Sequence, residues 1–176
     1  MNDAAKSGDA PVRLPVQEHS AQPAANPAEN GELVQQRRVE YNRLVRQARL
    51  AGMILESVNF KIHPEVLGIN KSLLARSITP RTKVMASGIA DGTLVANIIW
   101  EAKFKFERRI LMKCTASYIV SYSNVKDCSE EAVGVFVEHV GKVATYAYFR
   151  ALYGQLDWAA TLGSDPLPIL QLQPKL

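Results

Sequence analysis

The stretch LVANIIWEAKFKFE, residues 94–107, decides the fold class of this chain of 176 residues. All of its even positions are apolar, whereas most of its odd positions are polar or charged. The even positions hold Leu94, Ala96, Ile98, Trp100, Ala102, Phe104 and Phe106. Successive side chains of a strand point to opposite faces, so a period of two over this length predicts a long antiparallel strand with one buried face.

Three more stretches carry a strand pattern on either side of this one. They are MILESVNFKIH at 53–63, RTKVMASGIA at 81–90 and ILMKCTASYIVSY at 110–122. Asp91-Gly92 precedes the run at 94–107 and predicts a tight hairpin, because a type I′ turn needs residues that tolerate positive φ. We therefore predict four antiparallel strands in meander order.

The sequence period changes after residue 122. Ser129 is a suitable helix N-cap, and the two acids that follow it favour a helix start. A second, longer helix has an apolar stripe at helical spacing and ends at Gly163. The stripe consists of Tyr148, Leu152, Gln155, Leu156, Ala159 and Leu162. Strands followed by helices predict an α+β fold, in which a four-stranded antiparallel sheet carries two helices on one face.

The N-terminal part of the chain has a different composition. Residues 1–31 are rich in Ala, Pro, Asn, Gln and Ser, and we predict a disordered tail because such a segment buries too little apolar surface. Residues 32–52 are predicted to form a basic amphipathic helix, with arginines mostly off its apolar stripe. A solvated basic face explains these arginines better than a nucleic-acid contact. Residues 53–176 then form one domain.

Composition excludes several classes of function. The formal net charge is +4 at pH 7, but the bases are spread along the chain, so we expect no nucleic-acid partner. No run approaches the roughly 18–20 apolar residues of a membrane helix, so we expect no membrane insertion. The chain starts without the apolar segment of a secretory signal. Its two cysteines are expected to be reduced thiols in the cytoplasm.

No catalytic or metal-binding pattern is present in the sequence. His19 falls in the predicted tail, while His63 and His139 have no neighbour that would make them a general base. Cys114 and Cys128 lack metal-ligand spacing, and there is no phosphate loop or nucleophile elbow. We therefore predict a protein that is not an enzyme and that uses no cofactor or metal.

Three stretches carry a likeness to a known family. They are ILESVNFKIHP at 54–64, ILMKCTASYIVSY at 110–122 and TYAYFRALYGQLDWAATLGSDPLPILQL at 145–172. In this order they resemble the first strand, the fourth strand and the final helix with its proline-rich strip in the SecB export chaperones. The resemblance implies an ATP-independent holdase, a cytoplasmic homotetramer that binds unfolded polypeptides. Family members deliver secretory precursors to the motor SecA, and related proteins are dedicated chaperones for an antitoxin in toxin–antitoxin systems.

The resemblance and the aromatic content together suggest a client-binding groove. The final helix carries aromatic residues on more than one face, and such a helix has to cover a second surface. The prolines of the last segment should hold it extended as a groove wall. The predicted groove residues are Trp100, Phe104, Tyr118, Tyr146, Phe149, Tyr153, Leu167, Leu170 and Leu172.

The other face of the sheet is the expected partner surface, with Lys61, Leu111 and Lys113 as its candidates. Export members of the family carry an acidic patch there, and Lys113 stands where an acid is expected. A reversed charge disfavours docking to SecA in the usual mode and favours a narrower client. The alternative to a chaperone is a non-enzymatic scaffold, whose exposed apolar faces only build an oligomer.

Overall fold

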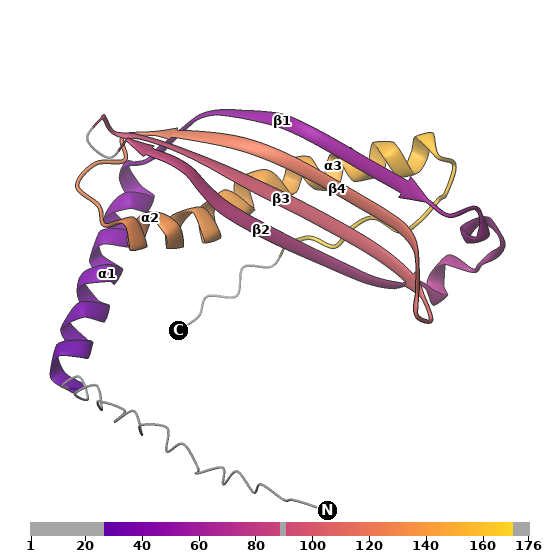
Figure 1. Cartoon of the computed structure of the whole chain (residues 1–176), viewed down its shortest axis with the longest axis horizontal. Helices are drawn as coiled ribbons and strands as arrows, with labels where there is room; N and C mark the ends of the chain where they lie inside the picture. The colour runs from indigo at the N-terminus through magenta and orange to yellow at the C-terminus, as the bar shows by residue number, and fades with distance from the viewer. Residues whose placement is uncertain (1–26, 89–90, 171–176) are drawn as a thin grey trace, which may run out of the picture.

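The computed structural model describes residues 27–88 and 91–170 (Figure 1). In chain order the elements are α1 (Pro27–Gln47), β1 (Arg49–Ile62), β2 (Ala75–Gly88), β3 (Thr93–Phe106), β4 (Arg109–Ser123), α2 (Glu130–Phe136) and α3 (Lys142–Ala159). Two short 3₁₀ turns, η1 (Pro64–Gly68) and η2 (Lys71–Leu73), join β1 to β2. Helices α2 and α3 lie on one side of the sheet, which confirms the predicted α+β class.

The strand order is β1-β4-β3-β2, with all neighbours antiparallel. The predicted meander order is therefore wrong for β1, which pairs with β4 at the far edge. The connection that contains η1 and η2 crosses the end of the sheet, which gives a Greek-key order. Most of β1 is exposed on both faces, because the helical layer packs on the other three strands.

The alternation that predicted β3 is confirmed. Its even side chains from Leu94 to Phe104 are at most 1% exposed, and the hairpin before it has Gly92 at φ +69°. The predicted start of β2 at residue 81 is wrong, because this strand begins at Ala75 and contains Pro80. Proline cannot donate a ladder hydrogen bond, and an edge strand such as β2 tolerates it.

The buried face of α3 differs from the predicted stripe. Tyr148, at the start of that stripe, is 59% exposed, whereas Phe149 is fully buried. The Phe149 ring stacks on Trp100 with a centroid distance of 5.8 Å, and the Tyr153 ring stacks on Phe104 at 5.4 Å. Both stripes have helical spacing, and the aromatic rings of β3 determine which one faces the sheet.

The two predicted helices are continuous in space. A π-helical turn, Val137–Gly141, joins α2 to α3 without a loop. Gly141 permits the close approach of this turn to β3, because a Cβ there would lie 2.7 Å from Cδ1 of Ile98. Ser129 caps α2 as predicted, with its Oγ accepting from the Ala132 N–H at 3.3 Å. The helix ends at Ala159, before the predicted Gly163.

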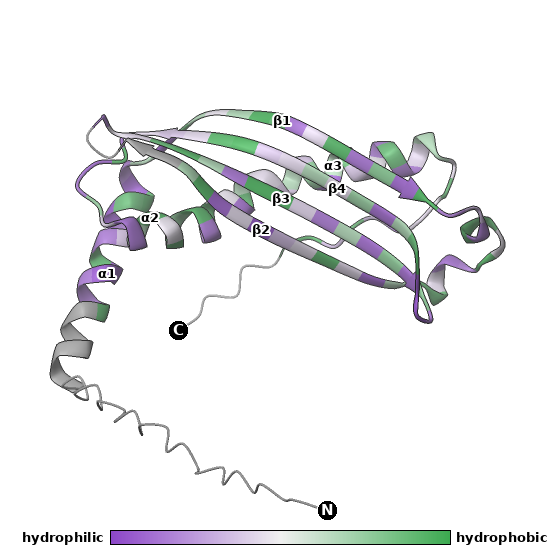
Figure 2. Ribbon diagram, viewed as in Figure 1, coloured by the Kyte–Doolittle hydropathy of each residue, from purple (hydrophilic) through white to green (hydrophobic). Residues whose placement is uncertain are grey.

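Helix α1 runs from Pro27 to Gln47 rather than over the predicted 32–52, because residues 49–52 already belong to β1. It projects away from the sheet (Figure 1). Leu44 is fully buried, and Glu40 Oε2 accepts from Ser129 Oγ at 2.6 Å, which ties the end of α1 to α2. Val34 is 65% exposed, so only part of the predicted apolar stripe is covered. The described surface of α1 is largely hydrophilic (Figure 2). Residues 1–26 of the predicted tail lie outside the described residues.

Candidate functional site

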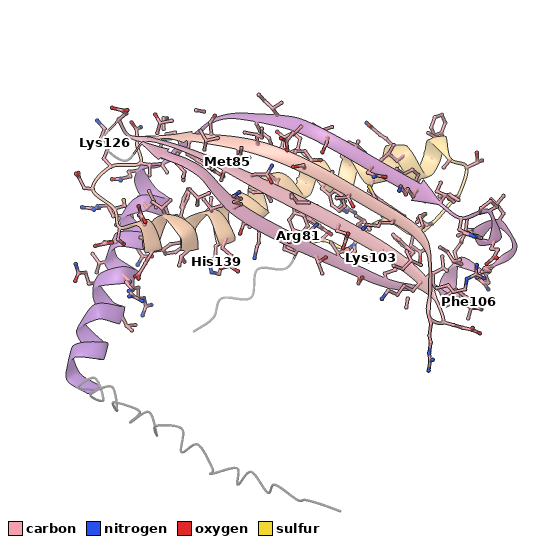
Figure 3. All side chains as sticks on the ribbon, in the orientation of Figure 1. Arg81, Met85, Lys103, Phe106, Lys126 and His139 are labelled. Atoms are coloured by element: carbon pink, nitrogen blue, oxygen red, sulfur yellow. The ribbon has the colours of Figure 1, made fainter. Side chains whose placement is uncertain are left out.

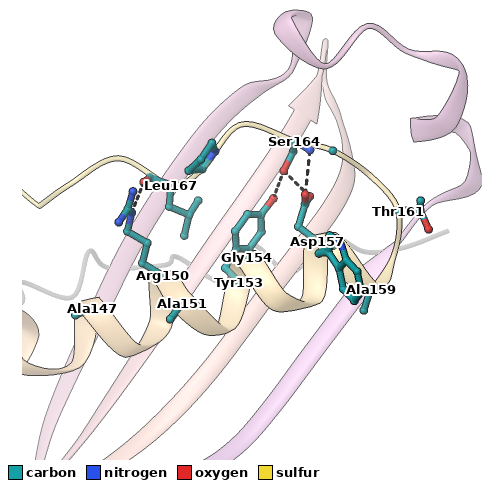
Figure 4. Close-up of a pocket in the computed structure, with 13 residues that line it drawn as sticks. Ala147, Arg150, Ala151, Tyr153, Gly154, Asp157, Ala159, Thr161, Ser164 and Leu167 are labelled. Carbon is teal, nitrogen blue, oxygen red and sulfur yellow. Dashed lines mark hydrogen bonds between the residues drawn. The ribbon is translucent and has the colours of Figure 1, made fainter.

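The C-terminal segment, residues 161–170, returns antiparallel along α3 and is held first by a polar cluster. Asp157 is only 6% exposed and accepts from the Ser164 N–H at 3.0 Å and from Ser164 Oγ at 2.5 Å (Figure 4). The hydroxyls of Tyr153 and Ser164 lie 2.7 Å apart. Burial raises the pKa of Tyr153, so this hydroxyl stays protonated as part of the network.

Further along, two side chains of α3 hold the backbone of the segment. Arg150 Nε donates to the Leu167 carbonyl at 2.7 Å, and the Tyr146 hydroxyl donates to the Pro168 carbonyl at 2.5 Å. The Leu167 side chain enters the core with 1% exposure, whereas Ile169 is 75% exposed. The segment is therefore extended and fixed, with apolar side chains at its surface.

A groove of about 810 Å³ lies between α3 and the C-terminal segment (Figure 4); we call it the α3 groove. Small residues on one helix face, Ala147, Ala151 and Gly154, form part of its lining. A Cβ at Gly154 would meet nothing within 4 Å. Trp158 also lines the groove and is 83% exposed. The groove is open because these positions lack bulk, and it offers an apolar surface beside an aromatic side chain.

A second hollow of about 280 Å³ lies where the segment passes β2 and β3. Its lining consists of Ile78, Pro80, Trp100, Lys142, Tyr146, Pro168, Ile169 and Leu170. Leu170 is 38% exposed at this position. The C-terminal segment therefore contributes apolar surface to two hollows, as expected for a groove wall.

Most of the predicted groove residues belong to the core. Trp100, Phe104, Tyr118, Tyr146, Phe149, Tyr153 and Leu167 are each at most 5% exposed. Three of them line neither hollow: Phe104, Tyr118 and Phe149. The prediction that these three face a client is wrong, because their rings fill the layer between helix and sheet. The other four are buried but form part of a hollow's lining, the α3 groove for Tyr153 and Leu167 and the second hollow for Trp100 and Tyr146. Leu170 is exposed, and Leu172 lies outside the described residues.

The groove residues that sequence reasoning missed are Ala147, Ala151, Gly154 and Trp158. Large apolar side chains predicted a groove, whereas the groove exists where α3 has small ones. The available signal was the row of small residues at i, i+4 and i+7, followed one turn later by a tryptophan.

Strand β1 presents a second apolar surface, which we call the β1 strip. By register its side chains Leu50, Met53, Leu55, Val58, Phe60 and Ile62 lie on the same face as the helices. Leu50, Leu55, Val58 and Ile62 are nevertheless 36% to 48% exposed. The helical layer packs on β2, β3 and β4, so this edge of the sheet is left uncovered.

The open face of the sheet carries Lys61 and Lys113, as predicted from alternation. Leu111 does not belong to this surface, because it is 2% exposed, so its prediction as a partner-facing residue is wrong. A register shift between β3 and β4 leaves Leu111 without a paired residue, and such a bulged residue departs from the alternation of its strand.

Glu101 is the central acid of the open face. Its carboxylate contacts Lys103 Nζ at 2.5 Å and Lys113 Nζ at 2.7 Å. Hydrogen bonds from Lys103 and then from Lys113 lower the pKa of Glu101 from 4.5 to about 2. Because the folded-state pKa lies below the unfolded-state value, the ionised carboxylate stabilises the fold above pH 4.5. That contribution is lost as the pH falls from 4.5 to about 2.

We expect Glu101→Gln to lower the free energy of unfolding by about 1–2 kcal/mol at pH 7. Solvent screening at the two half-buried lysines reduces this value. The difference from the wild type should shrink as the pH falls below 4.5, which urea unfolding at a series of pH values measures. Glu107→Gln, in the exposed turn after β3, is the control and should change stability by less than about 0.5 kcal/mol. A difference that does not vary with pH contradicts the ion-pair assignment.

The described residues offer little for catalysis. In the part of the chain that the structure describes, no three His, Cys, Asp or Glu side chains are grouped to hold a metal ion. Burial raises the pKa of Cys114 to about 11, and it also raises the pKa of Cys128, so neither is an activated nucleophile. None of the described helices combines the length and apolar character needed to cross a bilayer.

Comparison with known proteins gives one informative likeness. The SecB-like chaperone of Mycobacterium tuberculosis, solved in complex with a ChAD peptide from an antitoxin, superimposes with a TM-score of 0.64. The match covers 77% of this chain and 99% of that chain at 16% sequence identity. This chain has the SecB-like fold. The SecB-like fold accounts for its antiparallel sheet followed by a long helix.

Other comparisons add nothing to this. A Streptococcus agalactiae protein of unknown function matches over 70% of this chain and 98% of its own, at 11% identity. Its TM-score of 0.32 carries no argument about the fold. No protein-family model matches the chain, and no curated protein matches it significantly.

Proposed function

We propose that this protein is a chaperone that binds non-native polypeptides in the α3 groove. The observation that carries this proposal is an open groove of about 810 Å³ with small side chains along α3 and with Trp158 83% exposed. Unfolded polypeptides expose apolar side chains, and transfer of these from water to such a surface is favourable without a specific sequence. A fixed groove needs no nucleotide to hold them, so the activity is that of an ATP-independent holdase.

The client is an extended polypeptide with large apolar side chains. The SecB-like chaperone of M. tuberculosis was solved with an antitoxin peptide, which supports a dedicated client of that kind for this chain. Lys113 on the open sheet face, where the resemblance implies an acid, favours such a client over delivery to SecA. A pull-down with SecA tests this choice, and strong binding contradicts it.

The β1 strip supports assembly of this chaperone into an oligomer in the cytoplasm, with a tetramer as the expected state. A long edge strand with exposed apolar side chains is normally covered, and a second copy offers a matching strand. Light scattering should give a mass above the 19.4 kDa of one chain. A monomeric mass at working concentration contradicts this part of the proposal.

The experiment that tests the function is suppression of aggregation. We expect an equimolar amount of this protein to keep a chemically unfolded client soluble in the absence of ATP. Replacing the exposed Leu170 by Ser tests whether the client also contacts the second hollow, and it should weaken this retention because Leu170 contributes apolar surface there. Glu130→Gln, at the distant start of α2, is the control and should leave retention unchanged.

The alternative is a scaffold whose apolar surfaces serve only assembly. The same experiment separates the two functions, because a scaffold forms the oligomer but leaves client aggregation unchanged. If the Leu170→Ser variant keeps as much client soluble as the wild type, the second hollow is not part of the client site. Aggregation that is unchanged by a stable oligomer of the wild type contradicts the chaperone itself.

A further inference from the structure

Three lysines occupy one row across the open face of the sheet. Lys61 of β1 lies opposite Lys113 of β4, and Lys113 lies opposite Lys103 of β3. Like charges directly opposite each other destabilise a sheet. An arrangement that opposes folding in this way is expected at a binding surface, where function competes with stability.

The row retains a positive charge after its internal ion pairs are counted. Glu101 pairs with Lys103 and Lys113, so three lysine charges against one carboxylate leave a local charge of +2. Lys61 is exposed and forms no ion pair with any residue that the structure describes. Arg81 of β2 lies on the same face of the sheet by register (Figure 3). Glu56 is a second carboxylate on this face, where it accepts from Asn97 and Ser117. The four basic side chains outnumber the two acids, so this face attracts an anionic partner.

An apolar pair lies farther along the same face. Ile54 and Ile119 are directly opposite each other, and Ile54 is 66% exposed. At about 3.3 Å per residue, Ile119 and Lys113 are about 20 Å apart along β4. A partner that covers the lysine row and the isoleucine pair needs a negative end for the lysines and an apolar end for the isoleucines.

We propose that the open sheet face binds an acidic, amphipathic polypeptide segment of a partner protein. Its carboxylates meet Lys61 and Lys113, and its apolar side chains meet Ile54. Nucleic acid fits less well, because the lysine row spans only about 10 Å across three strands and so offers few phosphate contacts. This surface is on the opposite side of the sheet from the α3 groove, so the inference goes beyond client holding.

The test measures binding of a fluorescently labelled helical peptide with glutamates in one half and leucines in the other. Fluorescence anisotropy should show binding to the full chain that weakens as salt rises. A lysine-for-glutamate version of the peptide is the charge control. Labelled single-stranded DNA and vesicles of anionic phospholipid are tested in parallel. Tighter binding of either one than of the acidic peptide overturns the choice of a polypeptide partner.

Lys61→Glu is the decisive variant. We expect the affinity for the acidic peptide to fall about tenfold, because an attraction becomes a repulsion. The melting temperature should not fall, since the substitution places an opposite charge across from Lys113. A loss of binding without a loss of stability separates a binding role from a structural one.

Arg38→Glu, an exposed site on α1, makes the same change of charge elsewhere and serves as the matched control. Its affinity for the peptide should stay within about twofold of the wild type. Equal losses in the two variants, or no loss in Lys61→Glu, overturn the proposal. Suppression of client aggregation should be unaffected by Lys61→Glu, so failure of this proposal is distinguishable from failure of the chaperone function.

Discussion

Phe149→Ala should lower the free energy of unfolding by about 3–5 kcal/mol, the usual range for truncation of a buried phenylalanine. Phe149 is fully buried and stacks on Trp100 between α3 and the sheet. Trp100 is itself anchored, because its Nε1 donates to Thr145 Oγ1 at 2.8 Å. Loss of the ring therefore leaves a cavity that fixed neighbours cannot fill. Urea unfolding at one protein concentration measures the change, since oligomers have concentration-dependent stability.

Tyr148→Ala is the matched control, one residue earlier on the same helix. Tyr148 is 59% exposed, so its truncation should change the free energy of unfolding by less than about 0.5 kcal/mol in a single chain. Similar losses in both variants indicate that the exposed side of α3 is also covered, which the oligomer would explain. A larger loss for Tyr148→Ala than for Phe149→Ala contradicts the orientation of α3.

Gly154→Leu should abolish client holding while leaving the protein folded. Gly154 lines the α3 groove with open space at its Cβ position, so a leucine side chain fits there and occupies the groove. Leucine also favours the helix over glycine by about 0.8 kcal/mol, so the variant should be at least as stable as the wild type. Aggregation suppression measures the first effect and thermal unfolding measures the second.

Gly134→Leu is the control for this substitution. Gly134 lies in α2, has nothing within 4 Å of its Cβ position and does not line the α3 groove. It should gain a similar stability and keep full client holding. Full activity in Gly154→Leu means that clients bind elsewhere, and the β1 strip is then the next surface to test.

The intrinsic fluorescence of the protein gives an independent check of the same groove. The chain has two tryptophans, and only Trp158 is exposed, at 83% against 1% for Trp100. Binding of a tryptophan-free client in the α3 groove should therefore shift the emission of Trp158 to shorter wavelength. The Gly154→Leu variant should not show this shift.

Much of the fold could be predicted from short-range pattern. The alternation in β3 and β4 and the N-cap at Ser129 depend on neighbours in sequence, and the structure confirms them. The start of β2 at Ala75 could not be predicted, because Pro80 resembles a loop residue until its strand is known to lie at an edge. The position of β1 beside β4 depends on a long connection that has no local signature.

The location of the candidate site was predictable, but only some of its residues were, since Tyr153 and Leu167 line the α3 groove and Phe104 and Phe149 do not. The C-terminal segment was expected to form a groove wall, and it lies along α3 beside the groove. The aromatic residues expected to face a client, such as Phe104 and Phe149, instead pack against one another or against neighbouring rings. The same apolar character suits a core and a binding surface, so composition could not separate them.

The sequence by itself determined the type of each strand and helix but not every boundary, because a period of two or of 3.6 is a property of neighbours along the chain. Only the tertiary structure decided which face of α3 is buried. Two apolar faces compete on this helix, and the rings of Trp100 and Phe104 on β3 select the face that carries Phe149 and Tyr153. That choice turns Ala151 and Gly154 toward the C-terminal segment, and the groove results from this orientation.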